Sequence, residues 1–121
     1  MTRSMKVPGP DHPITIEQST EHVRVHAGGK LIADTSSPLV LHEAGYPGVY
    51  YIPLADVEQG ALEKTTSTTY CPYKGEASYY SIIGAEEGTD AVWTYESPYP
   101  AVGEIAGHVA FYPDRVEFGT D

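Results

Sequence analysis

The chain has one cysteine, Cys71, among its 121 residues, and it is poor in basic residues. A single thiol excludes an internal disulfide and any zinc site built from several thiolates. Seven Lys and Arg residues against seventeen Asp and Glu residues give a formal net charge of −10. Because the field around such a chain repels polyanions, we expect neither nucleic acid nor an anionic membrane as a partner.

Long hydrophobic runs are also missing from the sequence. No stretch approaches the roughly 18 apolar residues of a membrane span, and the first ten residues contain no apolar segment of a secretory signal. We therefore expect a cytoplasmic protein. Hydrophobic residues make up 40% of the chain and charged residues 20%, which is typical of a folded globular domain. One hydrophobic core is sufficient at this length.

Phenylalanine and tryptophan are scarce, with two copies and one copy, whereas tyrosine occurs ten times. Nearly every aromatic ring that the fold buries therefore brings a hydroxyl group that needs a hydrogen-bond partner. Tyrosines in this number indicate either a sheet with a wet outer face or a polar pocket.

Proline and glycine cluster in residues 8–13, which predicts an extended N-terminal arm over residues 1–13. A single β-rich domain is expected over residues 14–121. Strict polar–apolar alternation over residues 22–27, followed by Gly28 and Gly29, predicts a hairpin that returns over residues 30–34.

Short apolar or β-branched segments predict the remaining strands, at residues 39–43, 49–52, 65–70, 76–83, 91–96, 108–112 and 115–118. Short helices are expected at residues 53–62, which begin with Pro53, and at residues 101–106. The fold class is mainly β, with a single small antiparallel sheet and one or two short helices. We expect a curled or barrel-like sheet because closure removes exposed strand edges. The expected core includes Val23, Val25, Trp93, Val109 and Phe111.

The densest group of polar and aromatic residues lies around residues 71–75, Cys-Pro-Tyr-Lys-Gly. Pro72 cannot donate a ladder hydrogen bond, so this segment is predicted to be a structured turn. Lys74 near Cys71 would favour the thiolate, which is the nucleophilic form. The alternative is a structural cysteine beside an exposed lysine. A phosphate-binding loop is excluded, because it needs several glycines before the lysine and a Ser or Thr after it.

Two carboxylates, Glu43 and Asp56, are candidates to meet Lys74, either as an ion pair or as a general base. Alternatively, Glu43 is a rim residue and Asp56 favours a helix terminus. His22 and His26 lie on one strand face about 13 Å apart, which is too far for one metal ion. We expect no metal and no cofactor.

Several stretches together resemble the domain of unknown function 427 family, namely residues 8–14, 32–35, 51–53, 69–75, 79–81, 91–95 and 105–112. The resemblance covers nearly the whole chain and implies a small, mostly β, single-domain protein. A nucleotidyltransferase-like label attached to this family finds no support, since neither a phosphate loop nor a paired metal-binding Asp motif is present. The family pattern falls here on Glu43, Tyr51, Pro53, Asp56, Cys71, Pro72, Lys74, Gly75, Tyr79, Trp93 and Tyr95.

The leading hypothesis is a domain that binds a small polar or aromatic ligand in a pocket lined by Tyr and Trp. The candidate ligand-binding residues are Cys71, Lys74, Glu43, Asp56, Tyr51, Tyr79 and Trp93. An enzyme that uses Cys71 or Lys74 and a protein-interaction module are the alternatives, and self-association is left open. Because an ammonium beside a pocket needs a partner, we predict that Lys74 lies within about 6 Å of Glu43 or Asp56.

Overall fold

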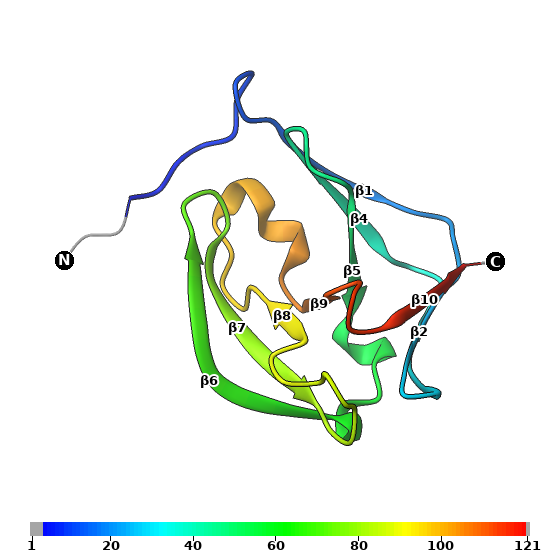
Figure 1. The fold of residues 1–121 in the computed structure, drawn as a ribbon. Helices are drawn as coiled ribbons and strands as arrows, with labels where there is room; N and C mark the ends of the chain where they lie inside the picture. Colours follow the sequence, from blue (N-terminus) through cyan, green and yellow to red (C-terminus); the bar gives the residue numbers. More distant parts are fainter. Residues whose placement is uncertain (1–3, 121) are drawn as a thin grey trace.

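The computed structural model describes residues 4–120, so residues 1–3 of the expected arm and residue 121 of the expected domain lie outside the described residues. Within the described range, antiparallel strands dominate and helical segments are short (Figure 1). The strands are β1 (Ile14–Gln18), β2 (Val23–Ala27), β3 (Lys30–Thr35), β4 (Leu39–Glu43), β5 (Val49–Pro53), β6 (Leu62–Cys71), β7 (Gly75–Ile82), β8 (Val92–Thr94), β9 (His108–Phe111) and β10 (Glu117–Thr120). The mainly β antiparallel fold is confirmed.

The strands divide between two sheets, which corrects the expectation of a single one. The larger sheet has seven strands in the order β1-β4-β5-β9-β8-β7-β6, and the smaller has three in the order β10-β2-β3. In the described part of the chain, β1 and β6 are the edges of the larger sheet, so it curls without closing (Figure 1). The edge strand β6 is rich in threonine and shifts register between Lys64 and Thr68, and such an irregular, polar edge tolerates exposure without closure.

Local turn chemistry explains the β2–β3 hairpin. Gly28 and Gly29 both have positive φ, 59° and 79°, which glycine adopts without the steric cost that a Cβ imposes. The predicted hairpin is therefore confirmed. Strand β1 was missed from the sequence, because two isoleucines alone carry its alternation, and it forms by pairing with β4.

The expected helix at residues 53–62 is instead two 3₁₀ turns, η1 (Leu54–Asp56) and η2 (Gln59–Ala61). Val57 separates them because it forms a β-bridge with Ala33, and Gly60 is a poor helix former. The segment η3 (Pro100–Ile105) occupies the place of the second expected helix. Among residues 4–120, no helix has the length and apolarity needed to cross a membrane.

The buried side chains form two clusters. The aliphatic cluster contains four of the expected core residues, Val23, Val25, Val109 and Phe111. The tyrosine cluster consists of Leu39, Leu41, Tyr51, Ala77, Tyr79, Tyr95, Val102, Ile105 and Ala110. Trp93 was expected in the core, but it is half-buried and packs against the edge of the tyrosine cluster, because its indole borders a hollow.

Candidate functional site

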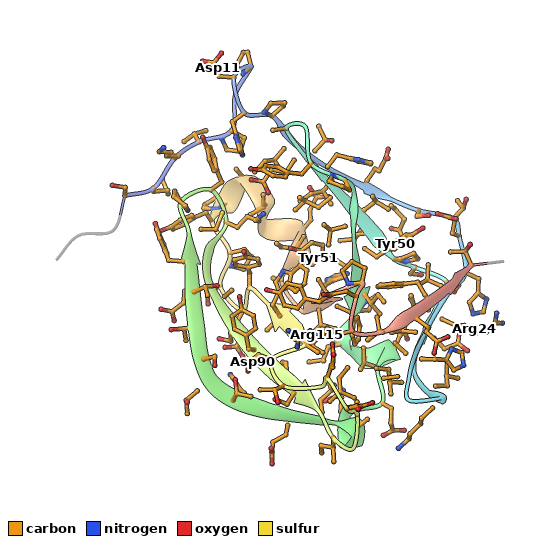
Figure 2. The ribbon with its side chains drawn as sticks, viewed as in Figure 1. Asp11, Arg24, Tyr50, Tyr51, Asp90 and Arg115 are labelled. Carbon is orange, nitrogen blue, oxygen red and sulfur yellow. The ribbon has the colours of Figure 1, made fainter. Side chains whose placement is uncertain are left out.

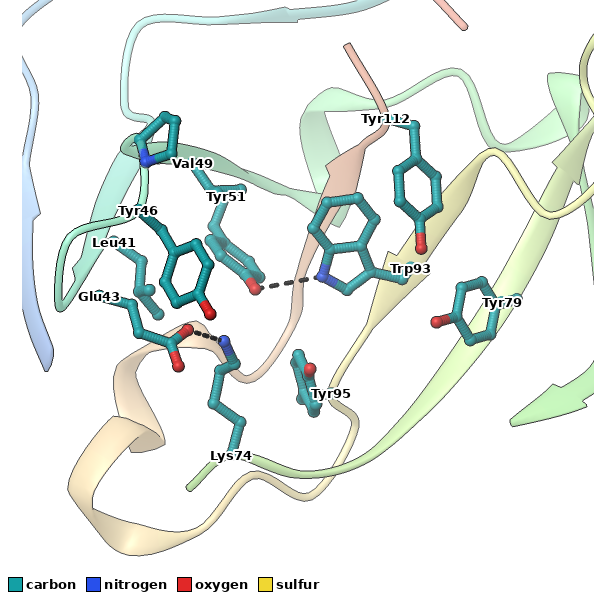
Figure 3. A pocket seen from close by; sticks show the side chains of 11 residues that line it. Leu41, Glu43, Tyr46, Val49, Tyr51, Lys74, Tyr79, Trp93, Tyr95 and Tyr112 are labelled. Carbon is teal, nitrogen blue, oxygen red and sulfur yellow. Dashed lines mark hydrogen bonds and ion pairs between the residues drawn. The ribbon is translucent and has the colours of Figure 1, made fainter. Parts of the chain in front are cut away.

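A hollow of about 240 Å³ lies beside the tyrosine cluster, between β4 and β5 on one side and β7 and β8 on the other (Figure 3). Its lining residues are Leu41, Glu43, Tyr46, Pro47, Val49, Tyr51, Lys74, Tyr79, Trp93, Tyr95 and Tyr112. Most of the lining is aromatic. Five residues that the sequence singled out meet here, namely Glu43, Tyr51, Lys74, Tyr79 and Trp93.

Strand alternation decides which tyrosine of β5 enters the hollow. Successive side chains of a strand point to opposite faces, so Tyr51 faces the hollow and Tyr50 lies on the other side of β5 (Figure 2). The Tyr50 hydroxyl donates to Glu21 at 2.7 Å. Tyr50 and Tyr51 are thus neighbours in sequence with different surroundings.

The turn between β6 and β7 carries Lys74 to the hollow. Cys71 pairs with Gly75 across the end of the hairpin, and the Lys74 N–H donates to the Cys71 carbonyl at 3.2 Å. Gly75 has φ of 111°, a conformation that other residues rarely adopt. The predicted structured turn is confirmed, and it directs the Lys74 side chain toward Glu43 (Figure 3).

Glu43 accepts hydrogen bonds from two sides. Lys74 Nζ lies 2.5 Å from Glu43 Oε1, and His12 Nε2 lies 2.7 Å from Glu43 Oε2. Burial by itself raises the pKa of Glu43, but the hydrogen bonds from Lys74 and His12 outweigh burial and hold that pKa below its ordinary value. Glu43 is therefore an anion at neutral pH, and the predicted carboxylate partner of Lys74 is found.

Residues of the N-terminal segment pack against the outside of this turn. The His12 ring stacks on Tyr73 with centroids 4.1 Å apart, and the Lys6 N–H donates to the Pro72 carbonyl at 2.8 Å. His12 belongs to the site but was missed as a candidate. Its sequence signal was weak, because a lone histidine among prolines has no periodicity that assigns it a partner.

Hydroxyl groups line the hollow in their protonated form. Burial raises the pKa of Tyr51 to about 12 and also raises the pKa of Tyr95. Burial together with the Tyr79 hydroxyl raises the pKa of Tyr112 to about 12. Trp93 Nε1–H donates to the Tyr51 hydroxyl oxygen at 3.2 Å. At neutral pH these tyrosines remain neutral and retain O–H groups to donate.

Two sequence candidates lie elsewhere. Asp56 accepts a hydrogen bond from Thr35 at 2.7 Å, and it borders a separate depression beside β3. Cys71 is half-buried and packs against the tyrosine cluster. In the part of the chain that the structure describes, the lining of the hollow includes neither residue. Among the same residues, no three His, Cys, Asp or Glu side chains converge as metal ligands.

Three aromatic lining residues were not ligand-binding candidates from the sequence: Tyr46, Tyr95 and Tyr112. Tyr95 was part of the family pattern, which was the available signal for it. Tyr46 lies in the loop after β4, and Tyr112 follows β9, so only the packing of distant strands brings them to the hollow.

A family model described as a domain of unknown function (DUF427) matches residues 15–121. The matched range contains all the lining residues of the hollow but not His12. No curated protein matches the chain.

Proposed function

This chain belongs to the domain of unknown function 427 family, and we propose that it binds a small, partly aromatic ligand in the hollow beside Lys74. The family description names no activity, so the proposal depends on the geometry of the hollow. The lining offers ring faces for stacking and a small number of polar groups for orientation, which is the composition of small-molecule sites.

The observation that carries the proposal is the placement of an ion pair among aromatic walls. The side chains of Lys74 and Glu43 are 12% and 17% exposed, whereas those of the surface pair Lys64 and Glu96 are 49% and 53% exposed. Removing charges from water is costly, and a well-packed apolar pair of similar volume often stabilises a fold at least equally well. A largely buried pair at the wall of a hollow is better explained by recognition of a ligand than by stability.

The size of the hollow limits the ligand. Sites for drug-sized molecules occupy roughly 300–1,000 Å³, and this hollow measures about 240 Å³. A molecule with one ring and one polar substituent is the size that such a volume accommodates.

Native mass spectrometry of the purified full chain tests the proposal by detecting a co-purified small molecule. We expect the wild type to carry one, the Lys74→Ala variant to lose it, and the Lys64→Ala variant to retain it. Lys64 is the matched control because it also pairs with a glutamate, at 2.9 Å, but lies outside the hollow. Equal occupancy in the wild type and the folded Lys74→Ala variant would contradict the proposed site.

A further inference from the structure

We infer that the hollow takes a small aromatic carboxylate whose oxygens accept hydrogen bonds from Lys74, Tyr51 and Tyr95. The inference rests on the proposed function and names the chemical class of the ligand. It follows from a count of which hydrogen-bonding groups around the hollow already have partners.

The hydroxyl of Tyr95 is the first group without a protein partner. Tyr95 is 7% exposed, and its hydroxyl makes no hydrogen bond to any residue in the described range. No side-chain nitrogen or oxygen in that range is sealed from solvent without a partner, so the Tyr95 hydroxyl keeps contact with solvent, and Tyr95 lines the hollow. A polar group in such a place favours a ligand that completes its hydrogen bond.

Tyr51 and Lys74 add further donors. Tyr51 is 1% exposed, and its oxygen already accepts the Trp93 N–H, which acts as a donor and never as an acceptor. The O–H of Tyr51 has no acceptor among the described residues. Lys74 carries three N–H donors, and Glu43 accepts one of them, so the others are available to a ligand.

The charged acceptor in the lining, the Glu43 carboxylate, is already engaged. One oxygen of Glu43 accepts from Lys74, and the other accepts from His12. The Tyr79 hydroxyl shares a hydrogen bond of 2.9 Å with Thr69. The unused capacity is therefore mainly for donation, which selects an acceptor, and a carboxylate offers two oxygens for charge-assisted hydrogen bonds.

Aromatic walls beside a carboxylate also characterise sites for organic cations. In this hollow, however, Lys74 Nζ already lies 5.9 Å from the centroid of the Tyr95 ring. A second cation at that ring would be repelled by Lys74, whereas an anion would be attracted. The geometry thus favours an anionic ligand over a cationic one.

Three probes that share one ring separate these possibilities: benzoate, benzyl alcohol and benzylammonium. Trp93 is the single tryptophan, so its fluorescence in the full chain reports on the hollow. We expect benzoate to bind about tenfold more tightly than benzyl alcohol, since hydrogen bonds to a charged acceptor are the stronger ones. Benzylammonium should not bind. Equal or tighter binding of benzylammonium would overturn the inference while leaving the proposed function intact.

Failure of all three probes would also overturn the inference. The proposed function would then be judged separately, by whether the wild type carries a co-purified molecule that the Lys74→Ala variant lacks.

A matched pair of variants tests the role of the Tyr95 hydroxyl. Tyr95→Phe keeps the ring and should weaken benzoate binding about tenfold. The thermal midpoint should stay unchanged, because the hydroxyl has no protein partner. Tyr50→Phe removes a hydroxyl on the opposite face of β5 and should leave benzoate affinity unchanged. Wild-type affinity in Tyr95→Phe, or equal losses in both variants, would refute the assignment.

Discussion

The aliphatic cluster and the tyrosine cluster share strands β5, β7 and β9 but differ in what their side chains require. Ile52 of β5 packs in the aliphatic cluster, while its neighbour Tyr51 packs in the tyrosine cluster. Side chains of the first cluster need only close packing, whereas buried tyrosines also need partners for their hydroxyls. The hollow and its ion pair lie beside the second cluster. We infer that the aliphatic cluster supplies most of the stability. The tyrosine cluster packs less uniformly and provides a polar wall for the hollow.

The largest expected effect is the loss of packing in the aliphatic cluster. Phe111→Ala should lower the free energy of unfolding by about 3–5 kcal/mol, because it leaves a cavity at a fully buried position. Urea denaturation measures this change. Tyr112→Ala, at the adjacent exposed position, is the control and should cost much less. A loss below about 1 kcal/mol in Phe111→Ala would contradict the claim that close packing in the aliphatic cluster supplies stability.

The next effect concerns the ion pair beside the tyrosine cluster. Glu43→Gln leaves the Lys74 ammonium largely buried without a counter-charge, so we expect a loss of about 1–3 kcal/mol in unfolding free energy. Glu96→Gln removes the equivalent carboxylate from an exposed pair and should change stability little. Equal losses in the two variants, measured by urea denaturation, would show that burial does not distinguish the pairs.

The pH dependence of stability sharpens the same comparison. Hydrogen bonds to Glu43 hold its pKa below the ordinary value in the folded chain. Such a carboxyl stabilises the fold above its unfolded pKa of about 4.3, and this contribution disappears as the pH falls through the lower folded pKa. The difference in unfolding free energy between wild type and Glu43→Gln should therefore be largest near neutral pH and decrease below about pH 4. A difference that is constant with pH would contradict the ionised pair.

The smallest expected effect concerns the chemical reactivity of the Cys71 thiol. Its thiol is half-buried against the tyrosine cluster and does not line the hollow among the described residues. We expect slow alkylation by iodoacetamide at pH 7 in the folded chain and much faster alkylation in urea, where packing no longer protects the thiol. Mass spectrometry over time measures both rates. Rapid alkylation of the folded chain would favour the alternative hypothesis that this chain is an enzyme with Cys71 as its nucleophile.

Local sequence determined the features that depend on a few neighbouring residues. Gly28 and Gly29 specified a hairpin because of their backbone freedom, and Pro72 with Gly75 specified the turn that carries Lys74. The alternation of valines over residues 23–27 placed them correctly in the core.

Only the tertiary structure decided which distant segments meet. Lys74 had two candidate carboxylate partners, Glu43 and Asp56. The pairing of β4 with β5 and the placement of the β6–β7 hairpin bring Glu43 to Lys74, 31 positions away in the sequence. Asp56 instead accepts a hydrogen bond from Thr35. The division into two sheets, the pairing of β1 and the approach of His12 were likewise beyond local patterns. Trp93 was placed wrongly for the same reason: periodicity shows which side of a strand a residue occupies, but only the packing of other strands decides whether that side is filled or left as a hollow.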